Sequence, residues 1–318
     1  MMSTKTGFIG LGAAVVAGSV LVAGAAQAEN LRFMTGPQGG SWYPMGGAIK
    51  QIVEEAAPGT TLQVLPGAGI ANVKAIETGR ADLAFANSVS TVDAIHGKPP
   101  FEEQAQNTCH LATLYPQYFQ IVTTEDAGVE SLDDLKGRAV TTQPTGNTGE
   151  AITAHLLEAQ GLTYDDLSRS DFVSYTDSVS LLKDGHAEVF TLGTTVPASA
   201  IMDLASARDV KLLEVSDELL ERMKEINPGY QRLVVPAGSY PGQDEDIGTI
   251  GYTTHLIGRC DLPDETVTAV LEQVVDKQQD LASVAKAIGS TSLEEMAADI
   301  GVPLHPAAES FWQEKGAL

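Results

Sequence analysis

Four short segments rich in small polar residues are the part of this sequence best suited to bind a small molecule. They span residues 36–43, 87–91, 143–149 and 193–197, and each is rich in Gly, Ser, Thr, Asn or Gln. Hydroxyl and amide side chains supply hydrogen-bond donors and acceptors, and glycine lets the backbone approach a ligand closely. None of the four segments contains Lys or Arg. A carboxylate ligand would therefore be held by backbone N–H groups and helix dipoles rather than by basic side chains.

The candidate ligand-binding residues come from both halves of the chain. The first half contributes Gly40, Ser41, Trp42, Tyr43, Asn87 and Ser88, and the second half contributes Gln143, Thr145, Gly146, Asn147, Thr148, Gly193 and Thr194. We expect the amides that follow Gly40 and Gly146 to hold the anionic end of the ligand. Trp42 and Tyr43 have a polar edge and an apolar face, so we expect them to close over the apolar body of the ligand.

The sequence carries no pattern typical of catalysis or of a cofactor. A G-x-S-x-G motif and a G-K-[ST] phosphate loop are absent, and Gly67-x-Gly69 lacks the third glycine of a dinucleotide fingerprint. No His lies within the four segments, the six His are never three to five residues apart, and neither Cys belongs to a C-x-x-C pair. Asp244-Glu245-Asp246 reads as a solvated loop rather than a calcium site. We therefore expect no catalytic residue, no metal and no cofactor.

Short β-branched runs alternate with helical patterns, which is the signature of βαβ units and an α/β fold. Strands are predicted at 31–35, 61–65, 81–86, 139–142 and 249–258, with helical stripes at 45–56, 70–78 and 152–159. After Pro263, apolar positions through Ile288 predict one long helix. In parallel sheets, ligands bind beyond the carboxyl ends of the strands, which is where the four polar segments lie.

Two similar stretches indicate that the chain is built from two related halves. Gly79 and Gly185 both open a G-x-A-acid-apolar run before a strand, and each follows an earlier glycine, Gly40 or Gly146, by 39 residues. Chance is the alternative, because glycine stops are common. With 318 residues, the length also suits two lobes, since domains usually span about 100 to 200 residues.

The charge balance restricts the partners. There are 42 Asp and Glu against 19 Lys and Arg, which gives a formal net charge of −23. Nucleic-acid binding requires a basic face, so we expect no nucleic-acid partner and no polybasic membrane anchor. Cys109 and Cys260 are the two cysteines, and the sequence leaves open whether they pair or are two separate buried thiols.

Residues 1–28 read as a secretory signal peptide. Lys5 precedes an apolar run rich in small residues, and Ala26-Gln27-Ala28 fits the A-x-A cleavage rule. The expected mature protein, residues 29–318, has no other run near the ~20 apolar residues of a membrane span. We therefore expect a soluble protein outside the cytoplasm, and the family resemblance described next implies the periplasm.

Several motifs, spread in order along the mature chain, resemble the TAXI family of periplasmic solute receptors, which are substrate-binding subunits of TRAP-type transporters. The matching stretches are Thr35-Gly36, Gly39-Gly40-Ser41-Trp42-Tyr43-Pro44-Met45-Gly46-Gly47, Glu77-Thr78-Gly79-Arg80-Ala81-Asp82-Leu83-Ala84, Leu114-Tyr115-Pro116, Ser131-Leu132-x-x-Leu135-Lys136-Gly137-Arg138, residues 236–246 and Asp261-Leu262-Pro263. The first segment departs from the family pattern, because it carries Pro37-Gln38 and Trp42 where the family usually has further glycines or threonines and a Tyr.

The resemblance implies a two-lobed type II periplasmic-binding-protein fold with mostly parallel sheets and crossing hinge strands. It places lobe 1 at residues 29–121 and 255–318, and lobe 2 at residues 122–254. It implies a carboxylate ligand such as glutamate, glutamine or 2-oxoglutarate, delivered by a monomeric receptor to the membrane permease subunits of a sodium-coupled transporter. On that map Cys109 and Cys260 lie in the same lobe. Two other functions remain open from the sequence, an exported hydrolase or lyase and a periplasmic sensor subunit on the same fold.

Overall fold

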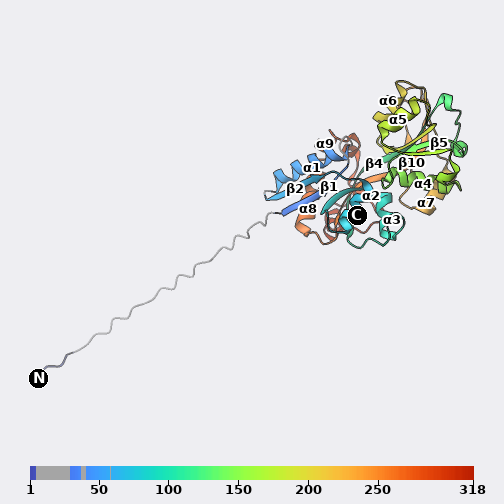
Figure 1. Cartoon of the computed structure of the whole chain (residues 1–318). Helices are drawn as coiled ribbons and strands as arrows, with labels where there is room; N and C mark the ends of the chain where they lie inside the picture. Colours follow the sequence, from blue (N-terminus) through green and yellow to red (C-terminus); the bar gives the residue numbers. More distant parts are fainter. Residues whose placement is uncertain (5–28, 37–40, 58) are drawn as a thin grey trace.

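The protein consists of two α/β lobes joined by two long strands (Figure 1). This computed structural model describes residues 1–4, 29–36, 41–57 and 59–318, so the predicted signal peptide lies largely outside the described residues. The strands of the first lobe are β1 (Glu29–Met34), β2 (Thr60–Leu65) and β3 (Leu83–Asn87). Its helices are α1 (Trp42–Ala56), α2 (Gly69–Glu77) and α3 (Ser88–His96), followed near the C-terminus by α8 (Asp264–Asp276), α9 (Gln278–Leu281), α10 (Leu293–Met296) and α11 (Pro306–Glu314).

The second lobe repeats the plan of the first. Its strands are β5 (Ala139–Thr142), β6 (Arg169–Phe172), β7 (Val189–Thr194), β8 (Val210–Leu212) and β9 (Gln231–Val235). Its helices are α4 (Thr148–Ala159), α5 (Tyr175–Lys183), α6 (Ser199–Ala205) and α7 (Asp217–Ile226). Short 3-10 turns occur at Glu125–Ala127, Leu132–Leu135, Tyr164–Asp166 and Lys286–Ser290. Gly79 and Gly185 occupy matching places, because each has a positive φ (65° and 71°) in the turn that leads into β3 or β7.

One continuous sheet carries both lobes, in the strand order β2-β1-β3-β10-β4-β7-β5-β6. The outer parts, β2-β1-β3 and β7-β5-β6, are parallel, as expected from βαβ units. The middle is formed by the long strands β4 (Thr108–Thr124) and β10 (Ile247–Arg259), which run antiparallel to each other. At Tyr118 and Phe119, β4 is paired with both strands: its pairing with β10 covers the residues before this point, and its pairing with β7 continues after it. The two strands therefore pass from one lobe to the other near these residues.

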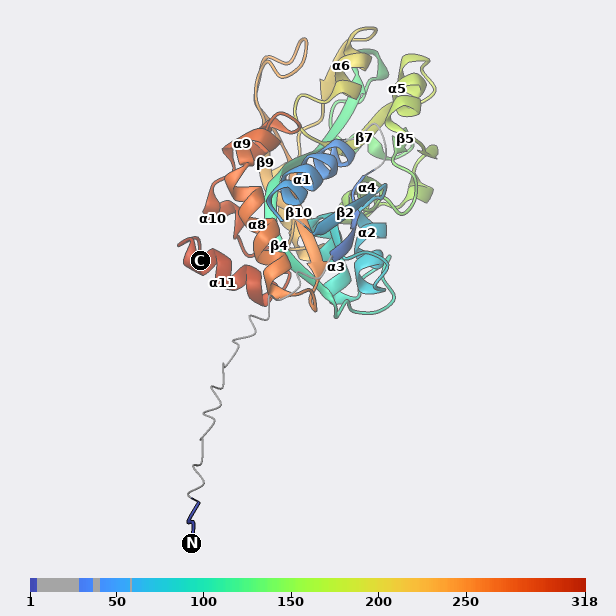
Figure 2. The same ribbon diagram turned by 90° about the vertical axis from the view of Figure 1, so that its left-hand side faces the viewer.

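Each lobe has its own apolar core. Leu31, Phe33, Ile49 and Phe85 pack with α8 and α11 in the first lobe, while Phe119, Ile152 and Val189 belong to a cluster in the second lobe. Figure 2 shows the C-terminal helices α8–α11 gathered beside the first lobe, away from α2 and α3. The second-lobe cluster also includes Val89 of α3 (Ser88–His96), so the lobes are joined by packing contacts as well as by the two crossing strands. Within the described residues, no helix combines the length and apolarity needed to cross a bilayer.

The prediction of one long helix after Pro263 is wrong. The helix α8 ends at Asp276, and the chain continues as the short α9 and a 3-10 turn. Gln278 explains the break, because its side-chain amide donates hydrogen bonds to the backbone carbonyls of Ile288 and Thr291, both at 2.6 Å. These hydrogen bonds hold the segment from Ile288 to Thr291 against α9, and Ile288 packs in the same apolar core as α8. The apolar spacing therefore predicted the buried face but not the bend.

The two cysteines, whose pairing the sequence left open, form a disulfide within the first lobe. Cys109 lies on β4 and Cys260 directly follows β10, with their Cα atoms 5.0 Å apart. Pairing of β4 with β10 sets Cys109 opposite Gly258. The disulfide therefore fastens the two crossing strands at the end that belongs to the first lobe.

Candidate functional site

A small cavity of about 150 Å³ lies between the two lobes, and we call it the interlobe pocket. Its lining comes from the ends of strands, the starts of helices and the two crossing strands. The lining residues are Ser41, Trp42, Ala68, Gly69, Asn87, Gln117, Gln143, Asn147, Thr148, Tyr175, Gly193, Thr194 and Tyr252. Drug-sized ligands usually occupy pockets of about 300–1,000 Å³. The interlobe pocket is therefore suited to a compact solute.

Five helices begin at the interlobe pocket, and in four of them, α1 to α4, the N-cap side chain makes no hydrogen bond to the helix. Helices α1, α2, α3 and α4 start after Ser41, Ala68, Asn87 and Asn147, and none of these four residues makes a capping hydrogen bond with its own side chain. In α4, the Gln143 side-chain oxygen instead accepts a hydrogen bond from the Gly149 N–H. Side chains of Ser174, Ser216, Ser292 and His305 do cap the starts of α5, α7, α10 and α11, and α5 also begins at the pocket, with Tyr175. Away from the pocket, α6, α8 and α9 have no side-chain cap. Uncapped starts leave backbone N–H groups available to a ligand, and the helix dipoles make these starts electropositive.

Asn72 holds the start of α2 at the strand ends. This fully buried amide donates hydrogen bonds to the backbone carbonyls of Thr35 and Phe85, both at 2.7 Å. Its side-chain oxygen accepts a hydrogen bond from the Ala68 N–H at 3.0 Å. One side chain therefore joins β1, β3 and α2, and fixes the edge of the pocket.

The crossing strands form another part of the wall. Gln117 on β4 and Trp42 on α1 both donate hydrogen bonds to the Thr254 hydroxyl, at 2.8 and 3.2 Å. Tyr252 on β10 is buried, and burial raises its pKa well above the ordinary value. The phenol is therefore neutral at physiological pH and provides a hydroxyl rather than a charge.

Thr148 joins the lobes directly. Its hydroxyl lies 2.9 Å from the Asn87 amide nitrogen and 2.9 Å from the Ser90 hydroxyl, and both of these residues belong to the first lobe. Thr148 itself begins α4 in the second lobe. Gly69 lies so close that a Cβ atom there would be 2.4 Å from the Thr148 oxygen. These contacts require the lobes to be close together, so the structure corresponds to a closed arrangement.

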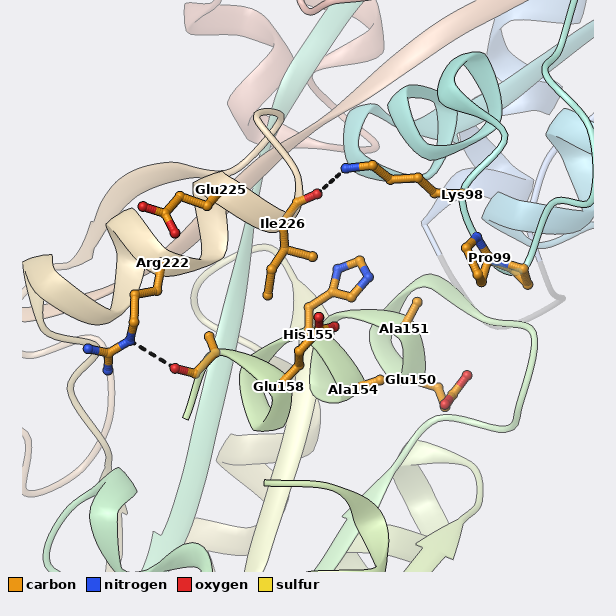
Figure 3. A pocket seen from close by; sticks show the side chains of 12 residues that line it. Lys98, Pro99, Glu150, Ala151, Ala154, His155, Glu158, Arg222, Glu225 and Ile226 are labelled. Carbon is orange, nitrogen blue, oxygen red and sulfur yellow. Dashed lines mark hydrogen bonds between the residues drawn. The ribbon is translucent and has the colours of Figure 1, made fainter. Parts of the chain in front are cut away.

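A second set of contacts joins the lobes along α3 and just beyond its end. The Asn227 amide, directly after α7, donates hydrogen bonds to the Val89 carbonyl and to the Asp93 carboxylate, both at 2.8 Å. Lys98 donates a hydrogen bond to the Ile226 carbonyl (Figure 3). Asp93 is 3% exposed, and burial raises its pKa to about 7. Closure therefore buries an ionisable group of the first lobe against the second.

A larger cavity of about 790 Å³, which we call the α4–α7 groove, lies beside these contacts. It is formed by α4, α7 and residues 98–100, and Figure 3 shows His155 directed into it near Lys98 and Ile226. None of the sequence-predicted site residues lines the groove. Only α4 begins beside the groove, where Glu150 of its first turn lines it, whereas several helix starts from both lobes line the interlobe pocket; this favours the smaller pocket as the ligand site.

The structure brings most of the predicted site residues to the interlobe pocket. Those that line it are Ser41, Trp42, Asn87, Gln143, Asn147, Thr148, Gly193 and Thr194. Gly40 lies outside the described residues. Tyr43, Ser88, Thr145 and Gly146 are close by but are not part of the lining.

Each of these four residues lies outside the pocket lining. Tyr43 is half-buried in the first turn of α1, and Thr145 is exposed. Ser88 is 3% exposed and accepts a hydrogen bond from the Thr253 N–H at 3.1 Å, so it supports β10 instead. Gly146 forms a turn with φ of 89° before α4. Their part in ligand binding stays a prediction.

Sequence reasoning missed five lining residues, Ala68, Gly69, Gln117, Tyr175 and Tyr252. Tyr175 is the clearest case: its hydroxyl donates to the Gly193 carbonyl at 3.0 Å and accepts from the Gly193 N–H at 3.1 Å. These two hydrogen bonds fix the end of β7 at the pocket. Within the described part of the chain, no group of three or more His, Cys, Asp or Glu side chains could hold a metal ion.

Comparison with known proteins agrees with this architecture. The profile of the NMT1-like family matches residues 33–316. The chain belongs to the NMT1-like family. One similar solved structure is PhnD1 from Prochlorococcus marinus in complex with methylphosphonate (11% identity, TM-score 0.54, covering 92% of this chain and 100% of that one). Another is the alkanesulfonate-binding protein SsuA from Xanthomonas axonopodis pv. citri bound to MOPS (14% identity, TM-score 0.50, covering 91% of this chain and 85% of that one).

A third similar structure is a putative L-cystine ABC transporter protein from Listeria monocytogenes (14% identity, TM-score 0.50, covering 82% of this chain and 97% of that one). At these identities the likeness establishes the fold alone. This NMT1-like protein therefore has the mixed α/β fold of type II periplasmic binding proteins, and the predicted fold class is confirmed.

Proposed function

We propose that this NMT1-like protein is a periplasmic solute receptor that captures one small organic acid or amino acid between its lobes. We further propose that it delivers the solute to the permease of a sodium-coupled TRAP-type transporter. The observation that carries the first proposal is the interlobe pocket, where helix starts from both lobes meet and the Thr148 hydroxyl accepts a hydrogen bond from Asn87 of the other lobe. A ligand that contacts both lobes stabilises the closed form, because it cannot make those contacts when they are apart.

The transporter type rests on the sequence motifs rather than on the fold. The resemblance to TAXI receptors covers the mature chain in order, whereas one structural neighbour carries the name of an ABC transporter. Periplasmic location rests on residues 1–28 and on the neighbours' fold. The rival proposal of an exported enzyme is not favoured, since no described residue that lines the pocket is a His, Asp, Glu, Lys or Cys that could serve as base or ionised nucleophile.

Thermal unfolding of the mature protein with a panel of amino acids and organic acids tests the receptor proposal. A solute present at 100 times its Kd is expected to add about 2.7 kcal/mol to the free energy of unfolding. The same mixtures, analysed for chemical change after incubation, should return the solute intact. Stabilisation by no member of the panel, or turnover of the stabilising solute, would contradict the proposal.

Ligand binding is also expected to change the fluorescence of Trp42. Of the two tryptophans in the chain, Trp42 lines the pocket, whereas Trp312 is fully buried with its indole N–H donated to the Leu111 carbonyl at 2.8 Å. The Trp42→Phe variant should therefore lose the ligand-dependent emission change, and Trp312→Phe should keep it. The reverse result would remove the first segment from the site.

A further inference from the structure

The interlobe pocket is walled by uncharged groups. None of its described lining residues is Asp, Glu, Lys, Arg or His. The sequences of the four polar segments, 36–43, 87–91, 143–149 and 193–197, contain no acidic or basic residue either. Any charge on the ligand must therefore be met by hydrogen bonds and backbone dipoles.

The available dipoles favour one sign of charge. Helix starts carry about half a positive elementary charge, and the interlobe pocket collects the starts of α1, α2, α3 and α4, whose N-cap side chains make no hydrogen bond to the helix. The first turns of α1, α2 and α3 hold no acidic residue that would neutralise this potential. Glu150, in the first turn of α4, lines the α4–α7 groove and accepts a hydrogen bond from the Tyr164 hydroxyl at 3.3 Å. An anion is therefore stabilised in the pocket.

An ammonium group is disfavoured by the same features. A buried ammonium group is stable when a carboxylate pairs with it, and an unpaired one is costly to desolvate. The acceptors in the pocket are neutral, and some are already engaged: the Gln143 side-chain oxygen accepts from the Gly149 N–H at 2.9 Å, and the Gly193 carbonyl accepts from Tyr175. Neutral acceptors beside electropositive helix starts are poor partners for a cation.

We propose that the solute is a compact organic anion without an ammonium group, an oxo or hydroxy acid rather than an amino acid of the same skeleton. This inference rests on the proposed receptor function and narrows its ligand class. The pocket volume of about 150 Å³ limits the solute to a small molecule. Neutral side chains such as Gln117, Asn87 and Tyr252 provide hydrogen bonds for oxo or hydroxyl oxygens.

Isothermal titration calorimetry with matched acid pairs tests this inference on the mature protein. The pairs are 2-oxoglutarate with L-glutamate, oxaloacetate with L-aspartate, and pyruvate with L-alanine, whose members differ in the oxo or ammonium group. We expect the oxo acid of at least one pair to bind at least ten times more tightly than its amino acid. An amino acid that binds as tightly as its oxo acid, or more tightly, overturns the inference and leaves the receptor function standing. Binding of no small acid contradicts the receptor function itself.

A charge-changing variant provides a second test. Gln143→Glu keeps the oxygen that accepts from the Gly149 N–H and adds a carboxylate to the pocket wall. We expect it to weaken oxo-acid binding at least tenfold and to reduce the preference over the paired amino acid. Gln313→Glu, on the exposed face of α11, makes the same change of net charge away from the pocket and should leave both affinities unchanged. An unchanged preference in correctly folded Gln143→Glu protein would overturn the inference.

Discussion

Replacing Gly69 with alanine is expected to weaken solute binding by about 100-fold or more, a loss of about 2.7 kcal/mol, with little change in stability. Gly69 begins α2 in the first lobe, and a Cβ atom there would lie 2.4 Å from the Thr148 hydroxyl oxygen and 3.0 Å from the Asn87 amide nitrogen. Thr148 and Asn87 are 4% and 8% exposed, so neither can move aside freely. The added methyl group therefore keeps the lobes apart.

The folded lobes themselves should tolerate this substitution. The backbone of Gly69 does not have a positive φ, and alanine is a better helix former than glycine. The matched control is Gly47→Ala on α1, where a Cβ atom would meet nothing within 4 Å. Calorimetry should give wild-type affinity for Gly47→Ala, and small-angle scattering with saturating solute should show a more open Gly69→Ala protein.

A double substitution identifies the atom responsible. Thr148→Ala removes the oxygen that the new methyl group would meet, along with the hydrogen bonds to Asn87 and Ser90. If the clash is the cause, adding Gly69→Ala to Thr148→Ala should weaken binding much less than it does in the wild-type background. Equal losses in both backgrounds, or wild-type affinity for Gly69→Ala alone, would show that this contact does not control closure.

The polar segments at the pocket could be predicted because their position follows from a general rule. Once strands and helices are assigned, the rule that ligands bind beyond the carboxyl ends of parallel strands selects residues such as Asn87, Gln143 and Gly193. The rule needs no knowledge of packing. It also explains why the fold class could be predicted from the alternation of strands and helices alone.

The residues contributed by β4 and β10 could not be predicted in the same way. Gln117 and Tyr252 stand in strands whose side chains are almost entirely buried, and nothing local separates a pocket side chain from a core one. Asn72 is similar, because a single polar residue within a helix gives no sign that it joins three elements. Such roles depend on which strands become neighbours, which is a long-range property.

Gly69 and the disulfide depend on long-range contacts too. The sequence offered Gly69 only as part of an incomplete dinucleotide fingerprint, because its neighbour Thr148 lies 79 positions later. Cys109 and Cys260 are separated by 151 positions and meet because β4 pairs with β10. In each case the sequence indicates the chemistry of the residue but not the distant residue that it contacts.

Solute affinity is expected to fall as the pH rises from about 5 to about 7, and Asp93 is the cause. In the closed arrangement, burial raises the pKa of Asp93 from its ordinary 3.8 to about 7, although the hydrogen bond from Asn227 acts in the opposite direction. Opening the lobes removes Asn227 and exposes the carboxyl group, so its pKa should return toward the ordinary value. Between the two pKa values the closed form binds a proton that the open form lacks, and closure therefore weakens as protons become scarce.

The expected effect is a loss of affinity of up to about tenfold per pH unit, because one pKa unit corresponds to about 1.36 kcal/mol. Above pH 7 both forms are ionised and the affinity should level off. Asp93→Asn retains an oxygen that can accept from Asn227 and removes the titration. Calorimetric affinities of this variant should therefore be nearly constant over the same range, while the wild-type protein should take up protons on binding in that window.

The other titratable groups near Asp93 would affect the pH dependence of solute affinity in different ways. Lys98 lowers the Asp93 pKa, so it opposes the effect of burial. Tyr230 stays neutral, because burial raises its pKa well above the ordinary value. His155, 2.7 Å from the Tyr230 hydroxyl, has a pKa lowered mainly by burial, so its closed form releases a proton and closure would strengthen with rising pH. A wild-type affinity that rises with pH would point to His155, and a fall that persists in Asp93→Asn would remove Asp93 from the closure of the lobes.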